Sequence, residues 1–185
     1  TVDLGGGTTD LVVTTIAVDG DGAHVTLIPE QDFREGFNLA GDDALKSRYA
    51  EPALAGRAMA AFAMTETNAG SDVASLATRA TRDGPDYVLD GAKAFISNAG
   101  IADVFTVFAK IDGKKFSAFL VPRDTPGLTV AGEEHKMGIR GSSTCALTFE
   151  DMHIPKENLL GEEGRGHKIA FNILNIGRFK LGASV

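Results

Sequence analysis

Short apolar segments separated by turn-forming residues fill the chain from Phe62 to Phe149. Asp83-Gly84-Pro85-Asp86, Asp90-Gly91 and Asp112-Gly113 supply residue types that favour tight turns. Many short strands at such close spacing are typical of an antiparallel barrel or sandwich. The pattern predicts strands over residues 76–82, 87–89, 93–97, 104–111, 116–121, 128–131 and 146–149.

The two ends of the chain have different patterns. Residues 11–18 and 24–28 are apolar and flank Asp19-Gly20-Asp21-Gly22, which predicts a β-hairpin. Asp42 has N-cap character and predicts a short helix running towards Ala50. Apolar residues recur at helical spacing over residues 168–181. We therefore expect an amphipathic helix there, with an apolar face that needs a partner.

Composition excludes several classes of function. The net charge of −7 argues against nucleic acid as the main partner. No apolar run approaches the roughly 20 residues that span a bilayer, so no membrane span is expected. The single cysteine, Cys145, allows no internal disulfide and is expected to be a buried strand residue. His24, His135 and His153 lack ligand-like spacing, so no metal site is predicted. These features are those of a cytoplasmic protein.

In two runs, 61–72 and 93–100, small and hydroxyl residues cluster beside an aromatic residue. Small residues allow close approach of the backbone, and Thr and Ser offer donors and acceptors to a flat, polar heteroaromatic ring. A purely structural interpretation is also available. Thr65 and Ser97 could be strand hydroxyls, and Ser71 with Asp72 could be a turn cap.

The two runs resemble the flavin-contacting strands in the middle domain of acyl-CoA dehydrogenases. Further strings at 46–49, 124–128, 136–140, 149–151, 154–161 and 175–178 fall in the order of that family. The resemblance implies a mainly β fold, an antiparallel β-barrel with a short helix before it and an amphipathic helix after it. It also implies the end of an N-terminal helical domain at 45–60, a middle β-barrel domain at 61–163, and the first helix of a C-terminal helical domain at 164–185.

The activity implied by this resemblance is α,β-dehydrogenation of an acyl-CoA thioester, with FAD as hydride acceptor. Family members are homo-oligomers that pass electrons to an electron-transfer flavoprotein or another acceptor. The family's catalytic glutamate belongs to the C-terminal domain, and Glu66 resembles a structural member of the signature, so no catalytic residue is assigned. The chain as given is expected to bind FAD weakly and to be inactive. The resemblance assigns cofactor contacts to Phe62, Met64, Thr65, Phe95 and Ser97, and substrate contacts to Ser71, Asn175 and Arg178.

The first residues suggest a different origin. Residues 1–11 are rich in glycine and resemble the second phosphate-binding loop of the actin-like ATPase superfamily. Residues 33–43 are similar to the SrfB-type branch of that superfamily. An actin-like fragment at 1–44 would make the chain a chimera with a junction near residues 41–46. Two alternatives to a dehydrogenase therefore stay open: a nucleotide-binding ATPase fragment and a non-catalytic structural module.

Overall fold

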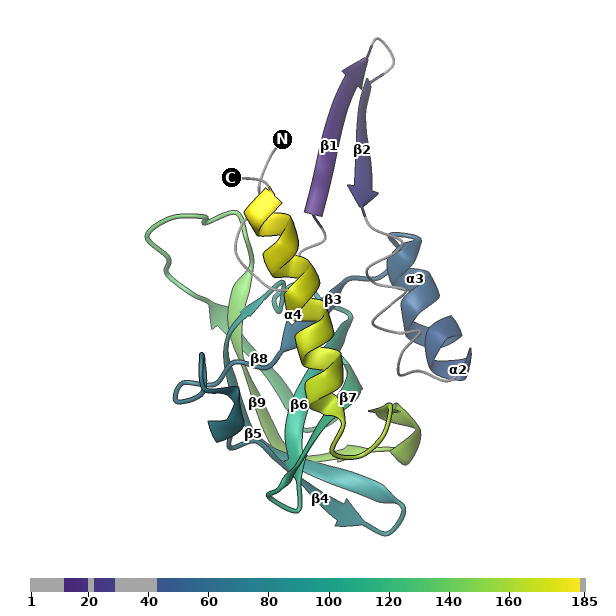
Figure 1. Ribbon diagram of the computed structural model, residues 1–185, viewed down its shortest axis with the longest axis vertical. Coiled ribbons are helices and arrows are strands. Elements are labelled where there is room, and N and C mark those ends of the chain that lie inside the picture. The colour runs from purple at the N-terminus through teal and green to yellow at the C-terminus, as the bar shows by residue number, and fades with distance from the viewer. Residues whose placement is uncertain (1–11, 20–21, 29–42, 184–185) are drawn as a thin grey trace.

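The computed structural model describes residues 12–19, 22–28 and 43–183 (Figure 1). Strands β1 (Val12–Asp19) and β2 (Gly22–Ile28) pair antiparallel, which confirms the predicted hairpin, although its turn at Gly20 and Asp21 lies outside the described residues. The segment 43–54 is helical throughout, with α2 at Asp43–Leu45, a π-helical turn at Lys46–Ala50 and α3 at Glu51–Leu54. The other elements are β3 Ala60–Ala63, a 3₁₀ turn Val73–Ser75, β4 Arg79–Asp83, β5 Asp86–Ser97, β6 Val104–Ile111, β7 Lys115–Pro122, β8 Leu128–Glu133, β9 Thr144–Ile154, a 3₁₀ turn Lys156–Asn158, β10 Leu159–Leu160 and α4 Gly166–Ala183.

Eight of these strands form one sheet in the order β10-β7-β6-β4-β5-β9-β8, with β3 paired to β6 beside that path. The prediction of a mainly β fold is confirmed. The prediction of an antiparallel β-barrel is corrected in two respects. Among the described residues no pairing joins the edge strands β8 and β10, so the sheet is open. In addition, β3 and β4 both run parallel to β6, because the chain returns to the same edge of β6 after a long connection.

The turn predicted at Asp90-Gly91 is wrong, because β5 runs through it. Asp90-Gly91 was expected to end one strand and begin another, yet β5 is continuous and pairs with β9 on both sides of this dipeptide. The register shifts between Leu89 and Gly91, where Asp90 faces both Glu150 and Asp151, so the extra residue of this β-bulge lies on β9. Gly91 has φ +147°, and a Cβ there would lie 2.8 Å from Thr78 Cα. Glycine at this position therefore allows the close approach of two backbones.

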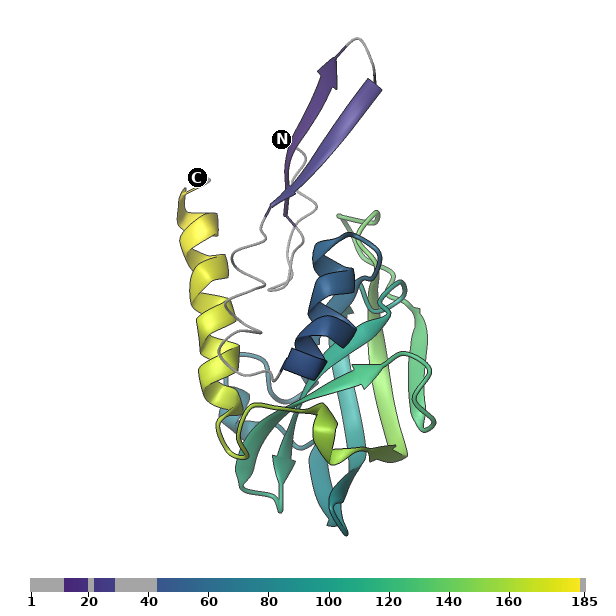
Figure 2. The same cartoon turned by 90° about the vertical axis from the view of Figure 1, so that its right-hand side faces the viewer.

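The apolar side chains form two clusters. One lies within the sheet and includes Phe105, Phe119 and Cys145, so the expected burial of the cysteine is confirmed. The other lies between the sheet and the helices and joins Tyr49 and Ile169 to residues of β3, β6 and β7. The helical segment 43–54 and α4 are separate rods beside the sheet (Figure 2). No helix among the described residues is long and apolar enough to cross a membrane.

Helix α4 begins in direct contact with β7. Gly166, the first residue of α4, is buried, and a Cβ on it would lie 2.8 Å from the carbonyl carbon of Ser117 and 2.9 Å from its Cα. The amide of Gly164 donates to Ser117 Oγ at 2.9 Å. Only a residue without a side chain fits at this position, so the sequence Gly164-Arg165-Gly166 fixes where α4 leaves the sheet.

Gly166→Ala should therefore destabilise the fold, because the backbone of Ser117 must move to admit the new methyl group. We expect a loss of about 1–3 kcal/mol, the usual cost of overpacking. Gly182→Ala is the matched control in the same helix, since nothing lies within 4 Å of its Cβ position and alanine favours helix. Chemical denaturation of both variants measures the difference. Equal stability of the two variants would contradict the close contact at Gly166.

Candidate functional site

Both β3 and β4 pair with β6, and between these two strands the chain forms a loop over residues 66–78. Glu66 and Ala69 exchange two backbone hydrogen bonds of 3.1 Å, which makes a tight turn at the start of this loop. The carboxylate of Glu66 then accepts hydrogen bonds from the amides of Ala77, at 2.5 Å, and Thr78, at 3.0 Å. One side chain at the start of the loop thus holds its end, an arrangement typical of a compact Ω-loop.

Glu66 also forms a buried ion pair with Lys93 of β5. The Nζ–Oε1 distance is 2.7 Å, and the side chains are 0% and 5% exposed for Lys93 and Glu66 respectively. Lys93 Nζ donates a second hydrogen bond of 3.2 Å to the carbonyl of Met64, and Thr78 Oγ1 donates to Glu66 Oε1 at 2.6 Å. Both charges therefore have several partners, as buried charges require.

The pKa values of the pair follow from burial and these bonds. Burial lowers the pKa of Lys93 to about 8, although the hydrogen bond and charge of Glu66 oppose that shift. Burial alone would raise the pKa of Glu66, but hydrogen bonds from Ala77, Lys93 and Thr78 outweigh it and hold the pKa below its usual value. At neutral pH the pair is therefore charged on both sides.

A bulge in β5 turns an aromatic ring outward. The register with β9 shifts between Lys93 and Ile96, and both of these side chains are buried. Phe95 between them has φ +57° and is 61% exposed. A positive φ is an outlier for a bulky residue and marks a strained position. The amide of Ala94 donates to the carbonyl of Thr65 at 2.9 Å, so the two signature runs meet at this bulge.

The structure brings some of the sequence-predicted residues together. Thr65 and the Phe95–Ser97 segment belong to hydrogen-bonded neighbours, and Thr65 and Ser97 are both half-buried. Met64 is buried beside Lys93, with its carbonyl bonded to that side chain. The ring of Phe62 lies in the core with its centroid 4.9 Å from that of Phe108.

The predicted substrate residues lie elsewhere. Ser71 is exposed in the 66–78 loop. Asn175 and Arg178 are exposed on α4, where Arg178 Nη1 donates to Asn175 Oδ1 at 3.4 Å. Within the part of the chain that the structure describes, no hydrogen bond or ion pair joins these three residues to Thr65 or Phe95.

Sequence reasoning missed Lys93 and Thr78. A signal for Lys93 was present, because it is a lone lysine between Ala92 and Ala94 in a strand, and the other run contains a carboxylate, Glu66, next to Thr65. Thr78 gave no comparable signal. Its role depends on the close approach to Gly91, which only the folded chain shows.

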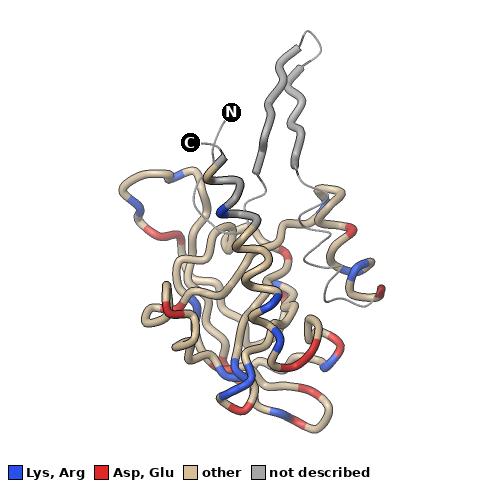
Figure 3. Tube along the Cα trace, in the orientation of Figure 1, with Lys and Arg blue, Asp and Glu red and all other residues tan. Residues whose placement is uncertain are grey.

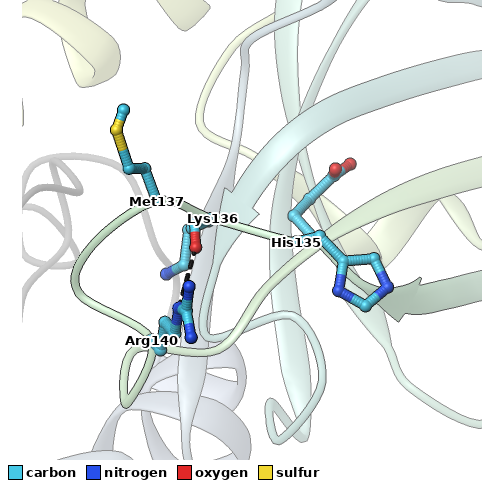
Figure 4. A pocket seen from close by; sticks show the side chains of 5 residues that line it. His135, Lys136, Met137 and Arg140 are labelled. Atoms are coloured by element: carbon cyan, nitrogen blue, oxygen red, sulfur yellow. Dashed lines mark hydrogen bonds between the residues drawn. The ribbon is translucent and has the colours of Figure 1, made fainter.

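A pocket at the loop between β8 and β9 contains none of the predicted site residues. Figure 4 shows Arg140 turned toward the carbonyl of Lys136, with a hydrogen bond of 3.1 Å, and Met137 extending away from the others. Met137 is 94% exposed, so it does not enclose a ligand. The other residues that line the pocket are Glu134 and His135. Among the described residues no group of three His, Cys, Asp or Glu side chains could hold a metal ion.

A cluster around Glu163 holds the segment that leads into α4. Its carboxylate accepts hydrogen bonds from Tyr87 at 2.6 Å, Arg82 at 2.5 Å and Lys115 at 3.1 Å. Charges of both signs gather at this end of the molecule, where β4 turns into β5 (Figure 3). The hydrogen bond from Tyr87, with those from Arg82 and Lys115, lowers the pKa of Glu163 to about 2, against a cost of burial. Burial and Glu163 raise the pKa of Tyr87 to about 12.

Glu163→Gln should destabilise the chain at neutral pH by about 1 kcal/mol, through loss of charged hydrogen bonds. The folded-state pKa of Glu163 is depressed, so its contribution is present above the unfolded value near 4.5 and is lost as pH falls towards 2. The stability difference from wild type should therefore shrink over that pH range. Urea denaturation at several pH values measures it, with Glu162→Gln as an exposed control. A difference that is constant with pH would contradict the ionised cluster.

Comparison with known proteins identifies the family of the β-rich part of the chain. Residues 61–152 match the family model of the acyl-CoA dehydrogenase middle domain, and residues 1–84 match that of virulence factor SrfB. A probable acyl-CoA dehydrogenase from Bacillus subtilis is 51% identical over 143 residues, covering 76% of this chain and 24% of that protein. The β-rich part of the chain belongs to the acyl-CoA dehydrogenase family.

Solved structures agree with this assignment. An acyl-CoA dehydrogenase from Bacillus anthracis, complexed with FAD, is 50% identical with a TM-score of 0.77 and covers 80% of this chain and 26% of its own. A structure described as the electron transferring flavoprotein of Acidaminococcus fermentans is 40% identical with a TM-score of 0.74. The match covers 78% of this chain and 39% of that one. The chain thus spans about a quarter of the length of the first relatives that it matches.

Proposed function

We propose that this chain supplies the flavin-facing β domain of an acyl-CoA dehydrogenase, which oxidises the α,β carbon–carbon bond of an acyl-CoA thioester. The strand residues Phe62, Met64 and Thr65 would lie along FAD, with Thr65 at the pyrimidine edge. Phe95 and Ser97 would cover the other part of the ring. FAD, when bound, would accept the hydride in this reaction.

The contact between the two signature runs is the observation that carries the proposal. The bond from Ala94 N to Thr65 O puts a half-buried hydroxyl next to the strained, exposed Phe95. An exposed aromatic face beside hydroxyl groups suits a planar heteroaromatic ring with polar edges. The residues present therefore fit a flavin.

The substrate and partner assignments extend the same proposal. Ser71 would contact acyl-CoA near its pantetheine or phosphate portion, and Asn175 and Arg178 would lie by the substrate channel. The enzyme would act as a homo-oligomer and pass electrons to an electron-transfer flavoprotein or another acceptor.

Glu66 is not assigned as the base that removes the α proton. Its oxygens already accept hydrogen bonds from Ala77, Thr78 and Lys93, and its lowered pKa makes it a weak base. The proposal assigns no general base among the described residues.

Phe95→Ala should weaken FAD binding by about two- to tenfold, because a stacked aromatic ring contributes about 0.5–1.5 kcal/mol. Phe171→Ala is the matched control, since Phe171 is a phenylalanine that is 42% exposed on α4. Quenching of flavin fluorescence, titrated into the millimolar range, measures both affinities. No FAD binding by the wild-type chain, or equal losses in the two variants, would contradict the proposal.

A second proposal concerns residues 1–44, and the match of residues 1–84 to virulence factor SrfB favours it. Under this proposal the segment is an actin-like ATPase fragment joined to the dehydrogenase part, with its glycine loop at residues 1–11. One such loop offers phosphate contacts but neither base recognition nor an enclosed pocket.

ATP should accordingly bind the chain no more tightly than inorganic phosphate does, and Gly6→Val should leave its affinity unchanged. Isothermal titration with ATP and with phosphate tests this, with Gly70→Val as a control in the other part of the chain. Tight ATP binding that Gly6→Val abolishes would instead make residues 1–44 a functional nucleotide site.

A further inference from the structure

Glu66 and Lys93 join three separate segments of the proposed flavin site. Lys93 lies on β5, two residues before Phe95, and its ammonium bonds to the carbonyl of Met64 and to Glu66. Glu66 directly follows Thr65 and holds the end of the 66–78 loop through Ala77 and Thr78. The two side chains thus connect the Thr65 strand, the Phe95 bulge and the loop that carries Ser71.

We propose that Glu66 and Lys93 are positioning residues that set the spacing between Thr65 and the Phe95–Ser97 segment. This inference rests on the proposed flavin function. Neither side chain is accessible to a ligand, because they are 5% and 0% exposed, so they act through the backbone that they hold.

The bulge explains why a lysine is needed at this position. A regular strand would turn side chains 93 and 95 to the same face. The register shift instead buries Lys93 and exposes Phe95. The bond from Lys93 to Met64 O and the bond from Ala94 N to Thr65 O fix the bulge against the neighbouring segment at two consecutive residues. The ammonium therefore holds the strained backbone of Phe95 in place.

A stabilising role alone predicts a different pattern of effects. Buried ion pairs add little net stability, and neutral replacement of both partners is often tolerated, whereas removal of one partner leaves a costly unpaired charge. If the pair serves stability alone, a neutral double variant should recover both folding and FAD binding. If it positions the site, that variant should recover folding without recovering binding.

The test uses the full chain with Lys93→Met and with the double substitution Glu66→Gln and Lys93→Met. The glutamine keeps one acceptor oxygen for Thr78, but the amide of Ala77, which bonds to the other oxygen of Glu66, loses its acceptor. The methionine keeps the aliphatic stem of Lys93 without its hydrogen bonds. Lys115→Met is the matched control, since it removes a lysine paired with Glu163 at 3.1 Å that is 52% exposed. Thermal stability, FAD affinity, the flavin absorption spectrum and hydrogen exchange of the Ala94 amide are measured for each.

We expect Lys93→Met to lose stability, to weaken FAD binding at least tenfold and to speed exchange at Ala94. The double variant should regain part of the lost thermal stability but keep the weakened binding, the altered flavin spectrum and the fast exchange. Lys115→Met should match wild type in binding, spectrum and exchange at Ala94.

Recovery of affinity and spectrum in the double variant would overturn the positioning role and leave the proposed function intact. Failure of the wild-type chain to bind FAD would overturn the proposed function. In that case slow, wild-type exchange at Ala94 in the double variant would overturn the inference as well, and fast exchange would support the geometric role of the pair.

Discussion

The buried contact between Glu66 and Lys93 is the interaction on which the site depends. It connects residues 27 positions apart at a Nζ–Oε1 distance of 2.7 Å, with both side chains almost fully buried. Burying two charges is costly, and the structure offsets that cost with hydrogen bonds from Thr78 and from the amide of Ala77. The same bonds close the 66–78 loop, so the charged pair and the loop geometry are one arrangement.

Two features of β5 accompany that arrangement. Gly91 lets the backbone of Thr78 approach the strand closely, and Thr78 also bonds to Glu66. The bulge between Lys93 and Ile96 buries the lysine and turns Phe95 outward at a positive φ. A regular strand would provide neither contact. The local strain at Phe95 is therefore part of how the fold presents an aromatic ring beside Thr65.

The local features of this fold could be predicted from the sequence, and its long-range features could not. The hairpin turn at Asp112-Gly113 depends on neighbouring residues alone and was predictable. Asp90-Gly91 has the same chemistry but lies within a continuous strand, opposite a bulge of β9 and close to Thr78. The open sheet and the parallel neighbours of β6 depend on pairings that no local pattern encodes. For the site, family resemblance supplied the residues proposed to face the flavin, whereas the partner of Glu66 required the folded chain.

An NMR titration of the isotope-labelled chain with FAD, followed through the backbone amides, tests most directly whether FAD binds where the Thr65 and Phe95 segments meet. If FAD binds there, the largest chemical-shift changes should fall on residues 64–66 and 94–98, the two segments joined by the hydrogen bond from Ala94 N to Thr65 O. Amides of the 134–140 loop and of the outer end of α4 should change less. Changes confined to those other regions, or the absence of any saturable change, would contradict the account.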